Sequence, residues 1–191
     1  MSQKDVEIKE VGVGALAAYA TIPMTIEVRS VLCFGGEGGS QAQERPVAPY
    51  VKDYDAQGGP EGWPTRFDVS TWGFWLAREG GVAVGAAAVA YNTGGVHLLE
   101  GGPDVGVLWD LRVRPEARGR GVGRALMEAA AGWLRERGCA RMMIETQDVN
   151  VGACAFYRAC GCALRRVDPM AYAEEPEVAH EVMVMWALEL G

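Results

Sequence analysis

The clearest hydrophobic pattern along the chain is helical and covers residues 122–137. Apolar side chains recur there every three or four positions, which places them on one face of a helix: Val122, Leu126, Ala129, Ala130, Trp133 and Leu134. Arg135 and Arg137 favour the negative end of the helix dipole, and Gly138 is typical of a helix end. The pattern predicts one long amphipathic helix in the second half of the chain.

Apolar runs and alternating patterns predict strands before and after this helix. They cover residues 5–10, two runs within 70–92 that are separated by Glu-Gly-Gly and read as a hairpin, 106–113, 140–146, a strand from Cys162, and 181–190. Short helices are expected over 12–20 and from an N-cap at Asn150 to Gly161.

The strand over 106–113 is expected to have two different faces. Strict alternation would turn Val107, Trp109, Leu111 and Val113 to one side. The opposite side would carry Leu108, Asp110 and Arg112.

Two segments near the start are harder to assign. Residues 21–34 fit a helix or a strand, and residues 35–64 are polar and rich in glycine and proline, which predicts a long functional or mobile loop. The overall order of elements predicts a single α/β domain over 1–191 of the α+β type. Its mixed sheet would be largely antiparallel early in the chain, with parallel crossovers later.

Composition and charge narrow the function. The 191 residues carry a net charge of -7, which argues against nonspecific binding to nucleic acid or an anionic membrane and suits a cationic partner. The five cysteines are odd in number, and Cys160 and Cys162 have the wrong spacing for zinc, so we expect reduced thiols, no metal and a cytoplasmic protein. The N-terminus resembles no signal peptide, and no apolar stretch reaches the ~18 residues of a membrane span.

A glycine-rich loop precedes the long helix and predicts an anion site. Residues 118–123 read Arg-Gly-Arg-Gly-Val-Gly, and Arg118, Arg120 and Arg124 reverse the sign of an acidic chain locally. Free N–H groups at a helix start suit a phosphate or pyrophosphate. A triphosphate loop would need Gly-Lys-Ser/Thr, and a dinucleotide loop would follow its strand directly. Neither description fits this loop.

These residues resemble the GNAT superfamily of acetyl-CoA-dependent N-acyltransferases. The loop matches the family pattern Q/R-x-x-G-x-G/A, and the preceding residues match L-x-V-x-P-x-x-R. Asn150, Ala153, Tyr157 and Gly161 match N-x-x-A-x-x-x-Y-x-x-x-G-F, with Cys162 in place of the last Phe.

The resemblance implies a GNAT fold, acetyl-CoA as cofactor and a set of site residues. Parallel strands would border the cofactor cleft, and helices would cover both faces of the sheet. Backbone groups of the loop would hold the pyrophosphate, a central strand would pair with the pantetheine, and the second motif would contact the cofactor arm. The implied cofactor residues are Leu111, Arg112, Val113, Arg118, Gly119, Arg120, Gly121, Val122, Gly123, Arg124, Asn150, Ala153, Phe156 and Tyr157.

Acetyl transfer to an amine needs a proton acceptor and a proton donor. Asp110 is the candidate base, with a salt bridge to Arg112 or Arg114 as its alternative role; Glu145 is the second candidate base. Tyr157, which the resemblance places at the departing thiolate, is the candidate acid, with a place in the core as its alternative.

Three segments resemble the streptothricin acetyltransferases within this superfamily: residues 48–55, residues 144–161, and the late run from Val167 to Trp186. The resemblance implies a small cationic amine as substrate, as in antibiotic resistance. Its site would be lined by Tyr50, Asp53, Tyr54, Asp110, Glu145, Asp168 and Tyr172. N-terminal acetylation of proteins or peptides, and a non-catalytic acyl-CoA sensor, stay open as alternatives. The last strand suits a homodimer or burial within one subunit equally well.

Overall fold

The computed structural model describes residues 6–36, 41–56, 58–99 and 102–191. The chain forms two compact units. The first comprises the residues up to Met24, Tyr54–Met142 and Leu190–Gly191, and the second comprises Thr25–Asp53 and Met143–Glu189. The expectation of a single domain stays a prediction.

The first unit is built on four antiparallel strands in the order β1-β4-β5-β6. Their bounds are Val6–Val11, Gly73–Glu79, Val82–Ala90 and Val105–Val113. Gly80 and Gly81, with φ of 59° and 86°, join β4 to β5, a conformation that a tight hairpin turn requires and glycine adopts without strain. The hairpin predicted within 70–92 is therefore confirmed.

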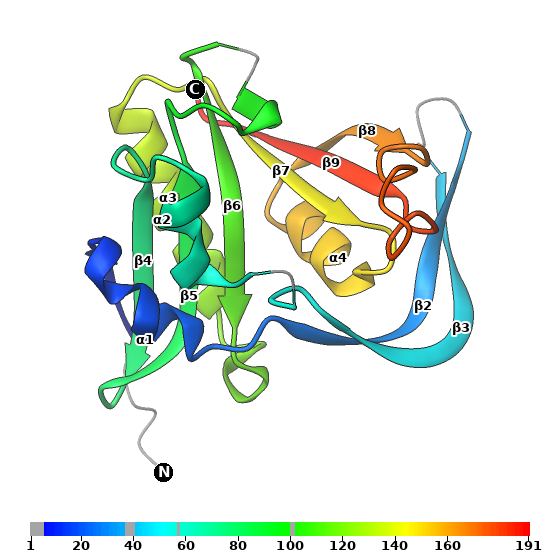
Figure 1. Ribbon diagram of the computed structural model, residues 1–191, viewed down its shortest axis with the longest axis horizontal. Helices are drawn as coiled ribbons and strands as arrows, with labels where there is room; N and C mark the ends of the chain where they lie inside the picture. Colours follow the sequence, from blue (N-terminus) through cyan, green and yellow to red (C-terminus); the bar gives the residue numbers. More distant parts are fainter. Residues whose placement is uncertain (1–5, 37–40, 57, 100–101) are drawn as a thin grey trace. The chain divides into compact units, whose positions relative to one another are not determined.

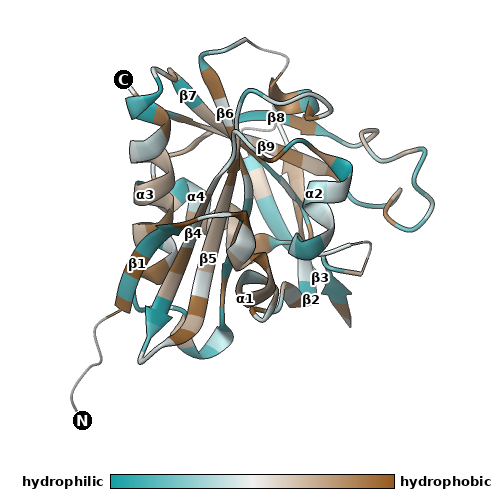
Figure 2. Ribbon diagram, turned by 60° about the vertical axis from the view of Figure 1, so that its left-hand side comes forward, coloured by the Kyte–Doolittle hydropathy of each residue, from teal (hydrophilic) through white to brown (hydrophobic). Residues whose placement is uncertain are grey.

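Helices lie on both faces of this sheet. The short helices α1 (Leu16–Ala20) and α2 (Trp63–Arg66) lie in front of it, and α3 (Val122–Glu136) lies behind it (Figure 1). A turned view places α3 on the opposite side of the strands from α1 and α2 (Figure 2). Single 3-10 turns cover Val13–Ala15, Pro60–Gly62, His97–Leu99 and Pro115–Ala117.

Helix α3 packs directly on the backbone of the sheet. A Cβ at Gly85 would lie 2.9 Å from Val122 Cγ1, and a Cβ at Gly106 would lie 2.2 Å from Leu134 Cδ2. The predicted apolar face is buried except for Ala129, which is half-buried. The glycines therefore set how closely helix and sheet approach.

The second unit contains the end of β7 (Arg141–Gln147), helix α4 (Val151–Ala159), and strands β8 (Ala163–Asp168) and β9 (Met183–Glu189). β8 and β9 are antiparallel, and β9 lies between β7 and β8. Asp168, expected in a loop, is the last residue of β8. A second, two-stranded sheet consists of β2 (Thr25–Gly35) and β3 (Gln41–Asp53).

The prediction of a continuous loop over residues 35–64 was wrong, because Gln41–Asp53 within it form β3. Every described residue of β3 is at least partly exposed, so no alternation of apolar and polar residues marks the strand. Pro46 and Pro49 also suggested a loop, but a two-stranded ribbon leaves one edge of each strand outside the hydrogen-bond ladder, where proline is tolerated. Residues 21–34, ambiguous from sequence, mostly form β2.

Strand β6 departs from the predicted alternation at Trp109. Ala88 pairs with Asp110 and Val89 pairs with Leu108, which leaves Trp109 as the extra residue of a β-bulge. Its ring packs against Phe67 and Trp72, at centroid distances of 5.0 and 5.3 Å. The bulge therefore places a large aromatic side chain immediately before Asp110.

All five cysteines are free, as expected; only Cys33 is exposed. Within the described part of the chain, no helix has both the length and the apolar character needed to cross a bilayer.

Replacing Gly106 with alanine should destabilise the protein by about 1–3 kcal/mol, because the new methyl group overlaps the fully buried Leu134. Urea unfolding measures this loss. Gly132→Ala in α3 is the matched control: its new Cβ has no atom within 4 Å, and alanine favours a helix, so its stability should rise slightly. Equal stability of Gly106→Ala and wild type would contradict the close packing.

Candidate active site

The glycine loop leads from β6 into α3 and leaves the helix start open. Gly119 and Gly121 have φ of 72° and 84°, and Gly121 is the N-cap of α3. Only glycine adopts these values without strain, and a Cβ at either position would have no atom within 4 Å. The loop therefore presents backbone N–H groups at the positive end of a 15-residue helix, which suits a pyrophosphate.

The arginines of the loop are less free than the sequence suggests. Arg118 Nε donates to the carbonyl of Val113 at 3.0 Å. Arg120 donates two hydrogen bonds to the carboxylate of Glu79 on β4, at 2.6 and 3.0 Å. Because Glu79 offsets the charge of Arg120, the predicted excess of positive charge at the loop is smaller than the sequence suggests.

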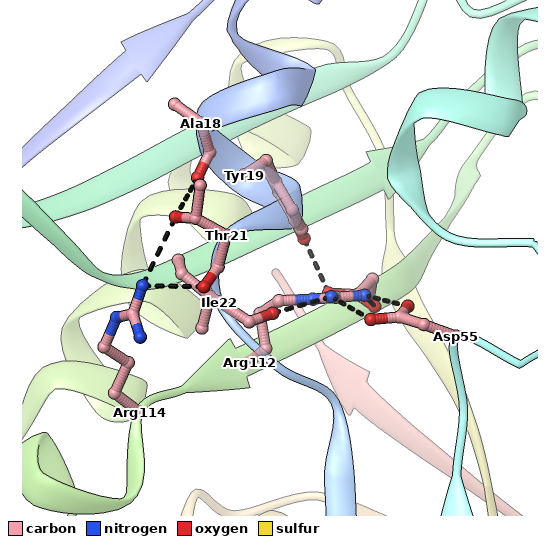
Figure 3. Close-up of polar contacts among 8 residues, drawn as sticks. Ala18, Tyr19, Thr21, Ile22, Asp55, Arg112 and Arg114 are labelled. Carbon is pink, nitrogen blue, oxygen red and sulfur yellow. Dashed lines mark hydrogen bonds and ion pairs between the residues drawn. The ribbon is translucent and has the colours of Figure 1, made fainter.

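Arg112, predicted as a cofactor residue, has its side chain buried within the first unit. The side chain is 1% exposed. Its guanidinium donates to Asp110 (2.6 and 2.9 Å), to Asp55 (2.8 and 3.0 Å) and to the carbonyl of Ile22 (2.9 Å) (Figure 3). Desolvation alone would lower the pKa of Arg112, but the hydrogen bonds to Asp110 and Asp55 and the charge of Asp110 outweigh it and raise the pKa. The side chain is thus committed to this network, and only the backbone of Arg112 remains for the cofactor. Its neighbours Leu111 and Val113 are half-buried.

Asp110 is held from two sides in the same network. Its Oδ1 accepts a hydrogen bond from the hydroxyl of Tyr19 at 2.7 Å, and both oxygens accept from Arg112. Burial, followed by the charge of Asp110, raises the pKa of Tyr19 well above its ordinary value, so that Tyr19 stays a donor. The salt bridge to Arg112, named as the alternative role of Asp110, is present, while the role of base stays a prediction.

The sequence did not identify Tyr19 or Asp55 as site residues. They lie 91 positions from Asp110 and 57 from Arg112 respectively. The signal for Asp55 was its place at the end of the segment 48–55, next to the candidate residue Tyr54. Such contacts depend on the fold and leave no local pattern.

In the second unit, α4 begins as predicted. Asn150 Oδ1 accepts the N–H of Ala153 at 3.1 Å and caps the helix. Ala153 and Tyr157 follow at three- and seven-residue spacing, so this side of α4 carries three of the predicted cofactor residues. Tyr157 is buried, and its ring meets that of Phe156 edge-to-face at 5.5 Å.

Two of the predicted acceptor residues are in contact. Tyr172 donates to Glu145 Oε1 at 2.7 Å and accepts from Gln147 Nε2 at 2.9 Å. Tyr50 and Asp53 lie on β3, and burial followed by the charges of Glu181 and Asp148 raises the pKa of Tyr50. The carboxylate of Asp168 forms an ion pair with Arg166 and accepts a hydrogen bond from the N–H of Met170. These local contacts stabilise the turn that follows β8. Tyr54 belongs to the first unit, as does Asp110.

Comparison with known proteins gives the same family as the motifs. The model of the acetyltransferase (GNAT) family matches residues 43–162. Streptothricin acetyltransferase A of Bacillus subtilis (strain 168) is 27% identical over 164 residues, which cover 86% of this chain and 87% of that protein. The streptothricin acetyltransferase of Streptomyces lavendulae is 31% identical over 139 residues, which cover 72% and 69%.

A solved structure extends the likeness to three dimensions. A protein from Bacillus anthracis str. Ames, in complex with acetyl coenzyme A, matches with a TM-score of 0.76 at 22% identity. The match covers 98% of this chain and 99% of that one. At this identity the likeness concerns the fold, and it confirms the predicted GNAT fold.

Replacing Gly121 with aspartate should weaken acetyl-CoA binding about 100-fold. An L-residue at φ 84° costs about 1–2 kcal/mol, and a carboxylate repels the pyrophosphate from the helix start. Titration calorimetry measures the affinity. Gly132→Asp introduces the same charge in the same helix, eleven positions away, and should bind like wild type; unchanged affinity of Gly121→Asp would exclude the loop as the pyrophosphate site.

The open helix start, its two left-handed glycines and the capped α4 all fit a ligand of the coenzyme A type. The family match covers well over half of the chain, and a near full-length structural neighbour carries acetyl coenzyme A. The chain belongs to the acetyltransferase (GNAT) family and is an acetyl-CoA-dependent N-acetyltransferase.

Proposed function

We propose that this enzyme acetylates a primary amine of a small cationic molecule of the streptothricin type. The observation that carries the proposal is the likeness to the streptothricin acetyltransferase of Bacillus subtilis over 164 residues, because it extends beyond the 120-residue span of the family model (43–162). The net charge of -7 suits a polycationic substrate. The free cysteines accord with a cytoplasmic enzyme, and inactivation of an antibiotic would be its role.

The cofactor residues that we propose come from both units. The N–H groups from Arg118 to Arg124 would hold the pyrophosphate at the start of α3. The backbone of Leu111, Arg112 and Val113 on β6 would pair with the pantetheine amides. Asn150, Ala153, Phe156 and Tyr157 would contact the cofactor arm, which brings the acetyl thioester that the reaction consumes.

The acceptor amine must lose a proton before it can attack. At pH 7 this costs about 4.6 kcal/mol for an amine with a pKa near ~10.4. A carboxylate at the site would first bind the ammonium group and then take the proton. Asp110 and Glu145 are the two candidates, and Tyr157 would return a proton to the departing sulfur.

The acceptor class can be tested by following CoA release with a panel of amines. Streptothricin should be the best acceptor, ahead of aminoglycosides and polyamines, and peptides with free N-termini should give only background rates. Preferred turnover of the peptides would favour the N-terminal acetyltransferase alternative. Acetyl-CoA binding without turnover on any amine would contradict the proposal and favour a sensor.

Replacing Tyr157 with phenylalanine tests the proton donor. Loss of the hydroxyl should lower kcat about 100-fold, within the range of general acid catalysis, with little change in acetyl-CoA affinity. Both are measured by steady-state kinetics and calorimetry. A kcat equal to that of wild type would leave Tyr157 with its alternative role in the core.

A further inference from the structure

The bulge in β6 brings two successive side chains to the same face of the sheet. Asp110 pairs with Ala88, and Ala88 pairs with Phe74, so these three side chains leave one face. In an unbroken strand, Trp109 would point to the opposite face. Instead its ring lies 5.3 Å from that of Trp72, which in turn lies 6.2 Å from that of Phe74. Trp109 and Asp110 therefore share a face.

This face carries a cluster of aromatic rings. Neighbouring ring centroids lie between 5.0 and 6.4 Å apart, and the members are Tyr19, Trp63, Phe67, Trp72, Phe74 and Trp109. Tyr19 comes from α1 and Trp63 from α2, the helices in front of the sheet (Figure 1). The next side chain of β4, Trp75, contacts Trp133 of α3 behind the sheet. The cluster thus belongs to one face alone.

Trp109 lies where the cluster reaches the surface. All six tryptophans are in the described part of the chain; five are buried, and Trp109 is half-buried. Two other rings of the cluster already lie close to a guanidinium: Arg112 is 5.2 Å from the centroid of Tyr19, and Arg66 is 5.3 Å from that of Phe67. Indole binds cations more strongly than the other aromatic side chains. The partly exposed ring of Trp109 is therefore suited to a cation.

Trp109 also lies next to the stretch of β6 that would hold the cofactor. In the proposed arrangement the pyrophosphate lies at the start of α3, and the pantetheine pairs with Val113, Arg112 and Leu111, in that order from the loop. The acetyl group, at the far end of the cofactor arm, would then be directed towards Asp110 and Trp109. An amine that attacks this group has to come within reach of the same two side chains.

The ring, rather than the carboxylate, is the group with attraction to offer. Both oxygens of Asp110 accept hydrogen bonds from Arg112, which offsets their charge. The face of an indole attracts a cation through its quadrupole and needs no counter-charge.

We propose that Trp109 is a specificity-determining residue that binds an ammonium group of the acceptor over the face of its indole ring. The bulge would then serve to turn this ring to the face that carries Asp110. The inference rests on the proposed function, since it concerns how the same site recognises a cationic acceptor.

The test compares Trp109→Phe with Trp109→Leu, two apolar replacements of which only phenylalanine keeps an aromatic face. With the best acceptor amine of the panel, Trp109→Leu should raise the KM for the acceptor about 10-fold and Trp109→Phe about threefold, since phenylalanine binds cations more weakly than tryptophan. The kcat and the KM for acetyl-CoA should stay close to wild type. Titration of the acceptor into the complex of enzyme and CoA should show the same order of affinities by calorimetry.

Trp133→Phe makes the matched change on the opposite face of the sheet and should leave the acceptor KM as in wild type. Equal losses in Trp109→Phe and Trp109→Leu would overturn the proposal, because the ring would then act only as an apolar wall. An acceptor KM of Trp109→Phe equal to that of wild type would also overturn it, and this variant decides the question if Trp109→Leu does not fold. Failure of the wild-type enzyme on every amine would refute the proposed function and this inference together. Wild-type turnover with unaltered acceptor affinity in the variants would refute the inference alone.

Discussion

The buried charge of Arg112 is the constraint on which the first unit depends. A guanidinium taken out of water is costly unless each donor is satisfied. Here the side chain donates five hydrogen bonds to Asp110, Asp55 and the carbonyl of Ile22, and it lies 5.2 Å from the ring centroid of Tyr19. Three segments far apart in the chain therefore have to meet at β6 for the charge to be buried at all.

The burial of Arg112 also gives the side chains and the backbone of β6 different roles. Because the side chain of Arg112 is bonded to Asp110, Asp55 and Ile22, only the backbone of the strand could pair with a cofactor. The bulge at Trp109 interrupts the ladder one residue before Asp110. A few residues later, Gly119 and Gly121 open the start of α3. The cofactor binding that we propose for this unit would therefore depend mainly on backbone groups.

The parts of the fold that the sequence predicted are those with a local cause. The apolar face of α3, the cap at Asn150 and the glycine turn after β4 each follow from residues a few positions apart. Strand β3 was missed because its exposed side chains carry no alternation and Pro46 and Pro49 suggested a loop. The network around Arg112 was missed because residues 19 and 55 meet residues 110 and 112 only through the tertiary fold. Glu145 and Tyr172 were both selected from sequence, but their contact, across 27 positions, was not foreseeable.

The two carboxylates named from sequence as candidate bases lie in different surroundings. Asp110 satisfies a buried cation and a buried phenol, so its charge is already in use within the fold. Glu145 accepts a hydrogen bond from Tyr172, whose pKa is raised by burial and by the charge of Glu145, so that the phenol stays a donor. The surroundings therefore give Asp110 a structural role in the first unit, and Asp110 and Glu145 both stay candidates for the base.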